Sequence, residues 1–129
     1  MRPELETFVA EVPPKIMKRL SKNAPSAVTA LTLVDTRLPA DEPIVALSFG
    51  NGYSDYGLLV LTDRRLLYVA DGVQSWRFEE IGKLGSNGKD IFVIEVIGQR
   101  TSSFGNLTNG PRFISALNTA INESKLGSL

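Results

Sequence analysis

The sequence predicts a mainly β, α+β protein: a helical arm over residues 1–37, then a seven-stranded antiparallel barrel with a closing C-terminal helix over residues 38–129. Before residue 37, apolar residues recur at helical spacing. After it, short runs of Val, Ile, Leu, Phe and Tyr alternate with Gly, Asn and Asp, a texture typical of strands and turns. An amphipathic stripe returns near the C-terminus. A length of 129 residues suits one domain.

Two helices are predicted in the arm. Pro13-Pro14 precedes a segment in which Ile16, Met17 and Leu20 form one apolar stripe. Pro25 interrupts this pattern, because proline lacks the backbone donor that a helix interior needs. Ser26 is then expected to cap a second helix that continues to about Val34.

The strands are expected in a meander, because every connection between them is short. Their predicted positions are residues 43–49, 57–62, 65–70, 74–79, 82–86, 91–97 and 100–104. Alternation in IFVIEVIG assigns Phe92, Ile94 and Val96 to the interior, and SWRFEE does the same for Trp76 and Phe78. This pattern predicts a sheet curled around a single core.

The C-terminal helix is predicted from its boundary residues and its stripe. Thr108 or Asn109 is expected to supply the N-cap, Pro111 suits the first turn, and Gly127 suits the end. The apolar stripe that would plug one end of the barrel consists of Phe113, Ala116, Leu117, Ala120 and Ile121.

The composition restricts the chemistry. The chain has no cysteine and no histidine, so disulfides, thiolate nucleophiles, the usual zinc sites and Ser-His-Asp triads are excluded. Fourteen basic and 14 acidic residues give a net charge of zero, which argues against a nucleic-acid binder. Neither a signal peptide nor a run long enough to cross a membrane is recognised, so a cytoplasmic location is expected. We therefore expect no enzyme, no cofactor and no metal.

Four segments together resemble the small bacterial pleckstrin-homology (PH)-like domains of the YokE type. They are LPADEPIVALSFGNG, GLLVLTDRRLLYV, WRFEEIGKLG and RFISALNTAI, within residues 36–123. The apolar strand, Thr-Asp-Arg-Arg and second apolar strand of GLLVLTDRRLLYV carry most of the likeness. The resemblance implies two nearly orthogonal antiparallel sheets capped by a C-terminal helix. It also implies a non-catalytic binding module, because relatives bind phosphoinositides, phosphotyrosine or proline-rich peptides, or other proteins.

The loop GNGYSDYG, residues 50–57, is the first candidate site. Phosphoinositide-binding PH domains place basic residues on this loop, but here it carries none, so phosphoinositide recognition is disfavoured. Its glycines are expected to serve turn geometry. Asn51, Tyr53 and Tyr56 are candidate partner-binding residues, since tyrosines are enriched at protein interfaces. In the alternative, one or both tyrosines fold down over the barrel rim.

Basic residues form two weaker candidates for anion or membrane contacts. Those of the arm are Lys15, Lys18, Arg19 and Lys22. They suit a helix on an anionic membrane, although a helix docked on the barrel is favoured and a dimerisation arm is a third alternative. Arg64 and Arg65 follow Asp63 at a predicted hairpin turn, where Arg65 would keep its charged head in water. An added contact of this pair with an anion is the minority alternative.

The paired acids Asp41-Glu42 and Glu79-Glu80 lack His, Cys or metal-type partners, so they are interpreted as solvated residues of turns and strand ends. The sequence thus favours a non-catalytic PH-like module for a protein or peptide partner, or for self-association as a homo-oligomer. A peripheral adaptor on anionic lipid is the alternative, and an enzyme using carboxylates only is a distant one. The small size also suits a phage or accessory protein.

Overall fold

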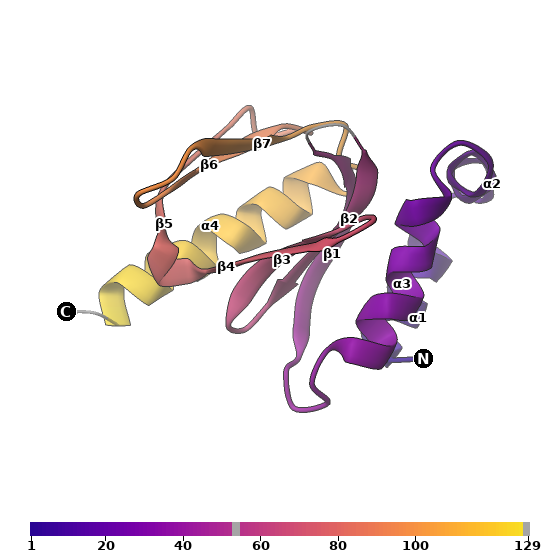
Figure 1. Cartoon of the computed structure of the whole chain (residues 1–129), viewed down its shortest axis with the longest axis horizontal. Helices are drawn as coiled ribbons and strands as arrows, with labels where there is room; N and C mark the ends of the chain where they lie inside the picture. The colour runs from indigo at the N-terminus through magenta and orange to yellow at the C-terminus, as the bar shows by residue number, and fades with distance from the viewer. Residues whose placement is uncertain (53–54, 128–129) are drawn as a thin grey trace.

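A four-stranded antiparallel sheet separates the N-terminal helices from the C-terminal helix and from a second, three-stranded antiparallel sheet (Figure 1). The computed structural model describes residues 1–52 and 55–127. Within them the N-terminal helices are α1 (Pro3–Glu11), α2 (Pro14–Asn23) and α3 (Pro25–Arg37). The four-stranded sheet contains β1 (Ile44–Asn51), β2 (Tyr56–Thr62), β3 (Arg65–Val69) and β4 (Val73–Arg77). After the short 3-10 helix η1 (Phe78–Glu80) come β5 (Ile81–Ser86), β6 (Phe92–Val96), β7 (Thr101–Phe104) and α4 (Gly110–Gly127).

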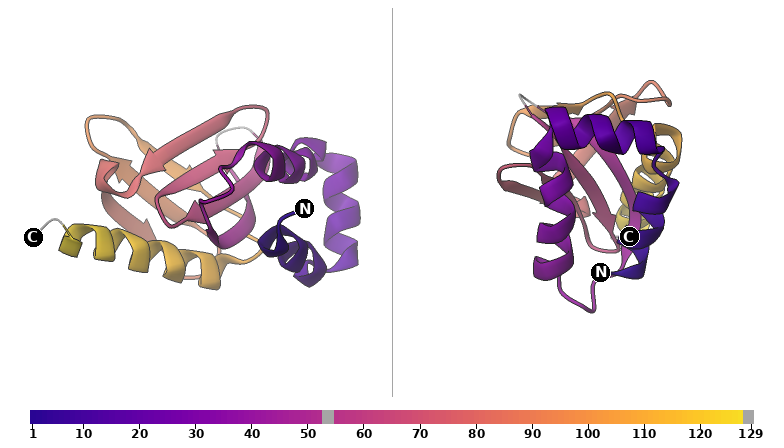
Figure 2. Two further views of the ribbon diagram at one scale, coloured as in Figure 1. Left: turned by 90° about the horizontal axis from the view of Figure 1, so that it is seen from below. Right: turned by 90° about the vertical axis from the view of Figure 1, so that its right-hand side faces the viewer.

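Neighbouring strands pair in sequence order, β1-β2-β3-β4 in one sheet and β5-β6-β7 in the other. The predicted meander is therefore confirmed, with strand bounds that differ from the expected ones by a few residues. Near its end the predicted strand 74–79 becomes η1. Figure 2 shows the three N-terminal helices gathered at one end of the molecule, with α4 running along the sheets away from them.

Strands β1, β2 and β3 of the four-stranded sheet are buried on both faces, which corrects the prediction of a single core. On the inner face, an inner core joins Leu59, Leu61 and Trp76 to β6 and α4. On the outer face, an outer core joins Leu58 and Val60 to the N-terminal helices. One-faced alternation holds in β6, but β2 is apolar on both faces because each face meets a helix.

The N-terminal helices follow the predicted break at Pro25, and α1 is an addition that the sequence analysis missed. Pro3 at its start with Glu4 and Glu6 in its first turn is a helix-start signal. Ser26 does not cap α3. The helix begins at Pro25, and the Ser26 hydroxyl donates to Asp71 Oδ1 at 2.9 Å.

Helix α4 buries Phe113, Leu117 and Ile121 against the sheets, as its stripe predicts, and it extends to Gly127. Thr108 and Asn109, the residues expected to cap it, bond to β1 through their side chains. Thr108 Oγ1 accepts from Phe49 N at 3.2 Å, and the Asn109 amide donates to Leu47 O at 3.1 Å. These bonds fix the helix start against the free edge of β1.

The first turn of α4 depends on a glycine. A Cβ on Gly110 would lie 1.6 Å from the carbonyl oxygen of Lys89. This oxygen belongs to the backbone, so it could move aside only if the 86–90 turn were distorted. Gly85, by contrast, has no atom within 4 Å of the position its Cβ would take. The approach of α4 to this turn therefore requires a residue without a side chain.

We expect Gly110→Ala to lower the free energy of unfolding by about 2–3 kcal/mol, because overpacking against backbone strains the structure. Gly85→Ala is the matched control and should change it by less than about 0.5 kcal/mol. Urea unfolding followed by circular dichroism measures both. Equal effects of the two substitutions would contradict the close approach of α4.

Candidate functional site

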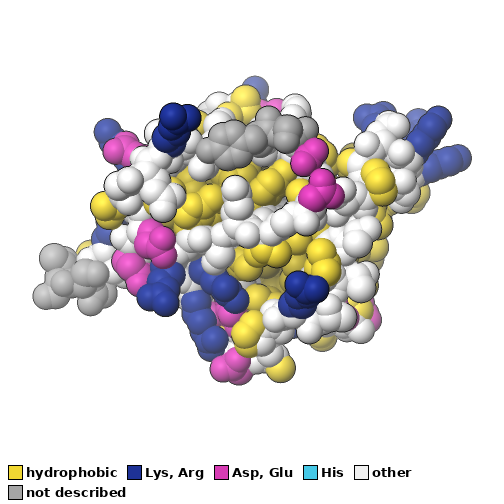
Figure 3. Space-filling model, in the orientation of Figure 1, with side chains coloured by type: hydrophobic (Ala, Val, Ile, Leu, Met, Phe, Trp, Pro, Cys, Tyr) yellow, Lys and Arg dark blue, Asp and Glu magenta, His cyan; other side chains and the backbone are white. Residues whose placement is uncertain are grey.

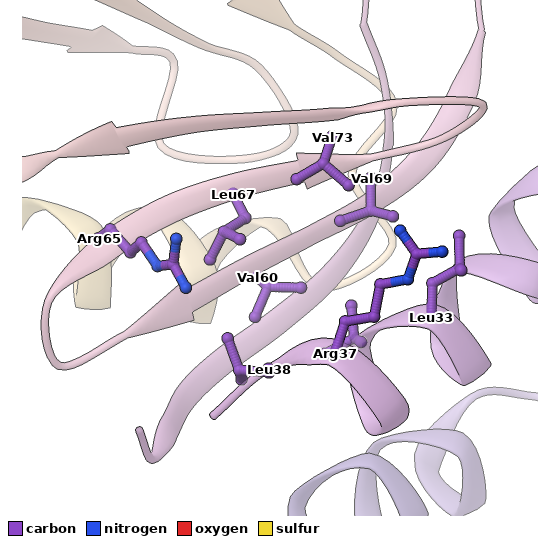
Figure 4. A pocket seen from close by; sticks show the side chains of 9 residues that line it. Leu33, Arg37, Leu38, Val60, Arg65, Leu67, Val69 and Val73 are labelled. Carbon is purple, nitrogen blue, oxygen red and sulfur yellow. The ribbon is translucent and has the colours of Figure 1, made fainter. Parts of the chain in front are cut away.

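An apolar groove of about 240 Å³ lies between α3 and the outer face of the four-stranded sheet (Figure 4). Nine residues line it: Leu33, Val34, Arg37, Leu38, Val60, Arg65, Leu67, Val69 and Val73. Seven of them are aliphatic, and the other two are arginines. The groove is therefore lined by aliphatic side chains and has two arginines as its polar residues.

The groove exists because α3 packs mainly on β2 and less on β3. The register pairs Leu67 with Ser75 and Val69 with Val73, so β4 continues the same face. On β4 that face is bare, and Val73 is 54% exposed. Figure 3 shows hydrophobic side chains open on this side of the molecule, over the four-stranded sheet. Helix α3 therefore covers β2 and part of β3 and leaves β4, the edge strand, uncovered.

Arg37 stands at the groove without a partner. It lies at the end of α3 and is exposed, and its side chain makes no hydrogen bond or ion pair within the described part of the chain. Figure 4 shows its side chain extending from α3 toward Val69. Its guanidinium group is therefore free to bind an anionic group at the mouth of the groove.

Arg65, at the other end, is held by a buried carboxylate. Its Nε and Nη2 donate to the two oxygens of Glu42 at 2.9 and 3.0 Å. Thr62 Oγ1 donates to the same carboxylate at 2.7 Å. Only 3% of the Glu42 side chain is exposed. The interpretation of Glu42 as a solvated turn residue is therefore wrong, and Arg65 directs its charge to Glu42 as well as to water.

The charge of Glu42 is stabilised by its partners. Burial by itself would raise the pKa of this carboxyl, but the hydrogen bonds from Arg65 and Thr62 and the positive charges of Arg65 and Arg64 act against it. The net result is a pKa below the ordinary value of 4.5. Glu42 therefore remains a carboxylate in the folded protein at neutral pH.

Arg64 occupies the predicted hairpin turn between β2 and β3, so the turn itself is confirmed. Its guanidinium nitrogens lie 3.4 Å from a carboxylate oxygen of Asp41 and 3.4 Å from one of Asp63, and 4.0 Å from Glu42. An anion at Arg64 and Arg65 would compete with these three carboxylates, which makes the pair a poor anion site.

Of the predicted loop residues, Tyr53 lies outside the described residues. Tyr56 folds down over the rim, as the alternative had it, because its hydroxyl donates to Asn106 O at 2.9 Å and its ring packs against the outer core. Burial raises the pKa of Tyr56 above 10.0. Asn51 is exposed, and its backbone exchanges hydrogen bonds of 2.7 and 2.9 Å with Gly105. Asn51 and Tyr56 are therefore register partners across β1 and β2, but the Tyr56 ring is partly buried and its hydroxyl already has a partner.

Two of the loop glycines make room for a ring, and turn geometry does not explain them. A Cβ on Gly52 or Gly57 would lie within 2.8 Å of the Tyr68 ring, and neither residue has a positive φ. The Tyr68 hydroxyl donates to Asp55 O and accepts from Gly52 N at 3.2 Å. The loop is thus tied to β3 by a tyrosine.

The basic residues of the arm are exposed on α2. Lys15, Lys18, Arg19 and Lys22 all face solvent, whereas Leu20 is buried and Ile16 and Met17 pack against the outer core. Figure 3 shows Lys and Arg side chains gathered where α2 lies, at the upper right. The docked arrangement of this helix is therefore the observed one.

The acidic pair in η1 serves the local backbone. Glu80 Oε1 accepts from Arg77 N at 3.3 Å, and Glu79 lies 3.9 Å from Arg77. Among residues 1–52 and 55–127, no group of three or more acidic side chains is arranged to hold a metal ion. In the same ranges no helix is both long enough and apolar enough to cross a bilayer.

The sequence analysis missed both Arg37 and Val73. Leu33 and Arg37 are four residues apart and therefore share a face of α3, so a cation at the end of an apolar stripe was the available signal. Val73 follows directly on Asp71-Gly72, a turn that was recognised, but the predicted strand began one residue later. Neither residue could be linked to the other from sequence, because their meeting depends on how α3 docks.

Comparison of the sequence with protein-family models gave no match, and comparison with curated proteins gave none. Among solved structures, the C-terminal domain of an unknown protein from Leishmania infantum is similar in fold, with a TM-score of 0.58. The likeness covers 73% of this chain and 94% of that chain at 15% sequence identity. At this identity it shows a shared fold and nothing about the ligand.

We expect Glu42→Gln to lower the free energy of unfolding by about 2–3 kcal/mol near pH 7, because it leaves Arg65 without its buried counter-charge. The pKa of Glu42 is lowered on folding, so its carboxylate stabilises the fold above 4.5, and this contribution is lost as the pH falls through the folded pKa. The difference between wild type and variant should therefore shrink at about pH 3. Urea unfolding at both pH values measures it.

Glu79→Gln is the control for this prediction, because Glu79 is an exposed partner of Arg77 and such surface pairs contribute about 0–1 kcal/mol. It should have little effect at either pH. A Glu42→Gln variant that is as stable as wild type near pH 7 would contradict the role of the buried pair.

Proposed function

We propose that the protein is a non-catalytic PH-like module that binds a peptide segment of a partner protein in the groove between α3 and the four-stranded sheet. The observation that carries this proposal is the groove itself: an open apolar surface beside a strand, with an unpaired arginine at its mouth. Exposed apolar surface next to a free polar group is typical of protein-binding sites.

The PH-like assignment extends the observed architecture. Four antiparallel strands, three more antiparallel strands and a C-terminal helix follow one another in the order that the family resemblance implies. The Thr-Asp-Arg-Arg hairpin, its most recognisable segment, joins β2 to β3. Such folds serve mostly as binding modules, and this supports a binding function by analogy.

The size of the groove favours a peptide over a cofactor. Pockets for small-molecule ligands usually measure about 300–1,000 Å³ and enclose most of the ligand. A groove of about 240 Å³ that is open along one side suits one or two side chains of a longer segment. The remainder of such a segment would lie along the neighbouring strand.

The strand that could receive it is β4. The free edge of β1 is occupied, because Glu4 Oε2 accepts from Ile44 N at 3.1 Å and Thr108 and Asn109 bond farther along. Among the described strands none pairs with β4 on the side away from β3. An extended peptide that adds to β4 would place alternate side chains on the groove face.

The membrane alternative rests on the four exposed basic residues of α2. Because the apolar residues of this helix pack on the protein, contact with a bilayer would be electrostatic and would lack an inserted apolar face. Such contact is weak and sensitive to salt. The groove therefore supports the peptide-binding function better than α2 supports the membrane function.

We expect a random peptide library displayed on phage to yield binders of the wild-type protein, and Val73→Asp to weaken them by about tenfold or more, because it places a charge against the apolar floor. Val73 is 54% exposed, so the fold should tolerate the change. Fluorescence anisotropy with a labelled selected peptide measures the affinity.

Ile97→Asp provides the matched control, since Ile97 is an exposed aliphatic residue just after β6, in the other sheet, with 68% exposure. It should leave peptide affinity unchanged. A library without binders, or binders that tolerate Val73→Asp, would reject the groove as the binding site.

A further inference from the structure

The charged residues that line the groove are all positive. Two arginines and no acidic residue are among its nine lining residues. Arg65 is neutralised by the bidentate contact with Glu42, so the remaining uncompensated charge belongs to Arg37. A ligand that fits this surface must therefore be apolar along most of its length and anionic at one point.

Nearby acidic residues do not neutralise Arg37. Asp35, two residues earlier on α3, accepts from the backbone nitrogen of Arg2 at 2.7 Å. Asp71, in the turn before β4, accepts from the Ser26 hydroxyl at 2.9 Å. Because neither is paired with Arg37 in the described structure, the five N–H donors of its guanidinium group are available to a ligand carboxylate.

We propose that the groove selects an extended peptide that carries an acidic residue two positions before or after an apolar residue. The proposal rests on the proposed peptide-binding function. Side chains two positions apart in a strand point to the same face and are separated by about 6.6–6.8 Å. The apolar side chain occupies the groove over Val69 and Val73, and the carboxylate pairs with Arg37.

Arg37 determines the specificity of the groove, whereas the aliphatic lining provides most of the affinity. The guanidinium fork binds a carboxylate through two parallel hydrogen bonds, which a neutral amide cannot reproduce. Replacing Arg37 by an acidic residue should therefore reverse the preferred charge without removing the apolar floor.

The test compares peptides selected from the same random library by wild type, Arg37→Glu and Arg100→Glu. Arg100 is exposed and lies just before β7 in the three-stranded sheet, so Arg100→Glu makes the same change in net charge away from the groove. Circular dichroism and thermal unfolding check that each variant is folded. Because both arginines are exposed, all three proteins are expected to fold.

We expect wild type and the control Arg100→Glu to select peptides with Asp or Glu two positions from an apolar residue. Arg37→Glu should instead select peptides with Lys or Arg at that position. A synthetic acidic peptide from the wild-type pool should bind Arg37→Glu about tenfold more weakly. Its version with Gln in place of the acid should bind wild type and Arg37→Glu about equally. Binding of the acidic peptide to wild type should weaken as salt is added.

Other outcomes overturn the proposal, and they separate it from the proposed function. Binders without acidic enrichment, or an equal response to Arg37→Glu and Arg100→Glu, would leave peptide binding in place and reject the selection by Arg37. The absence of any binder would reject both. Dimers in sedimentation that persist in Arg37→Glu and are lost in Val73→Asp would assign the groove to a second copy of the chain.

Discussion

The need to bury both faces of the four-stranded sheet is the constraint on which the rest of the structure depends. Along β2, Leu58 and Val60 belong to the outer core, and Leu59 and Leu61 belong to the inner core. All four are fully buried, so neither face can be left to water. The inner face is covered by the second sheet and α4. The outer face needs the N-terminal helices, and because α3 packs mainly on β2, the cover ends before β4. The groove is the uncovered remainder of that face.

The junction between the helices and the sheet is fixed by polar contacts around Glu42. Its carboxylate binds Arg65 and Thr62, while its backbone oxygen accepts from Arg2 at 2.9 Å. Arg2 also bonds to Pro39 O through its side chain and to Asp35 through its backbone nitrogen. A buried ion pair contributes little net stability by itself, but one that is fully hydrogen-bonded disfavours any arrangement in which it would be broken. These contacts set where α3 ends relative to β3, and hence the position of Arg37 over the groove.

The local sequence pattern predicted most of the helices and strands. The features that it missed depend on contacts between residues far apart in the sequence. Alternation placed Phe92, Ile94 and Val96 correctly because a strand with one wet face shows its period in the sequence. It could not separate the two cores, because a strand buried on both faces, such as β2, has no alternation to read. Glu42 was misjudged for a related reason: its partners Thr62 and Arg65 are about 20 residues away, and nothing next to Glu42 in sequence indicates them. The contact of the Tyr56 hydroxyl with Asn106, 50 residues away, was likewise not visible in the local pattern of the 50–57 segment.

Three arginines in this chain show why residue type alone does not locate a binding site. The adjacent pair Arg64 and Arg65 was the conspicuous feature of the sequence, yet acidic residues of the 41–42 segment and Asp63 surround it. Arg37 has an ordinary sequence context, but it is the last residue of α3 and makes no ion pair within the described residues. A cation beside an apolar surface gains more from a ligand carboxylate than one already paired, because the paired one must first give up an interaction of similar strength. The proposed recognition of an anionic ligand therefore depends on how the helices dock, because of these three arginines Arg37 is the one whose side chain has no partner in the described structure.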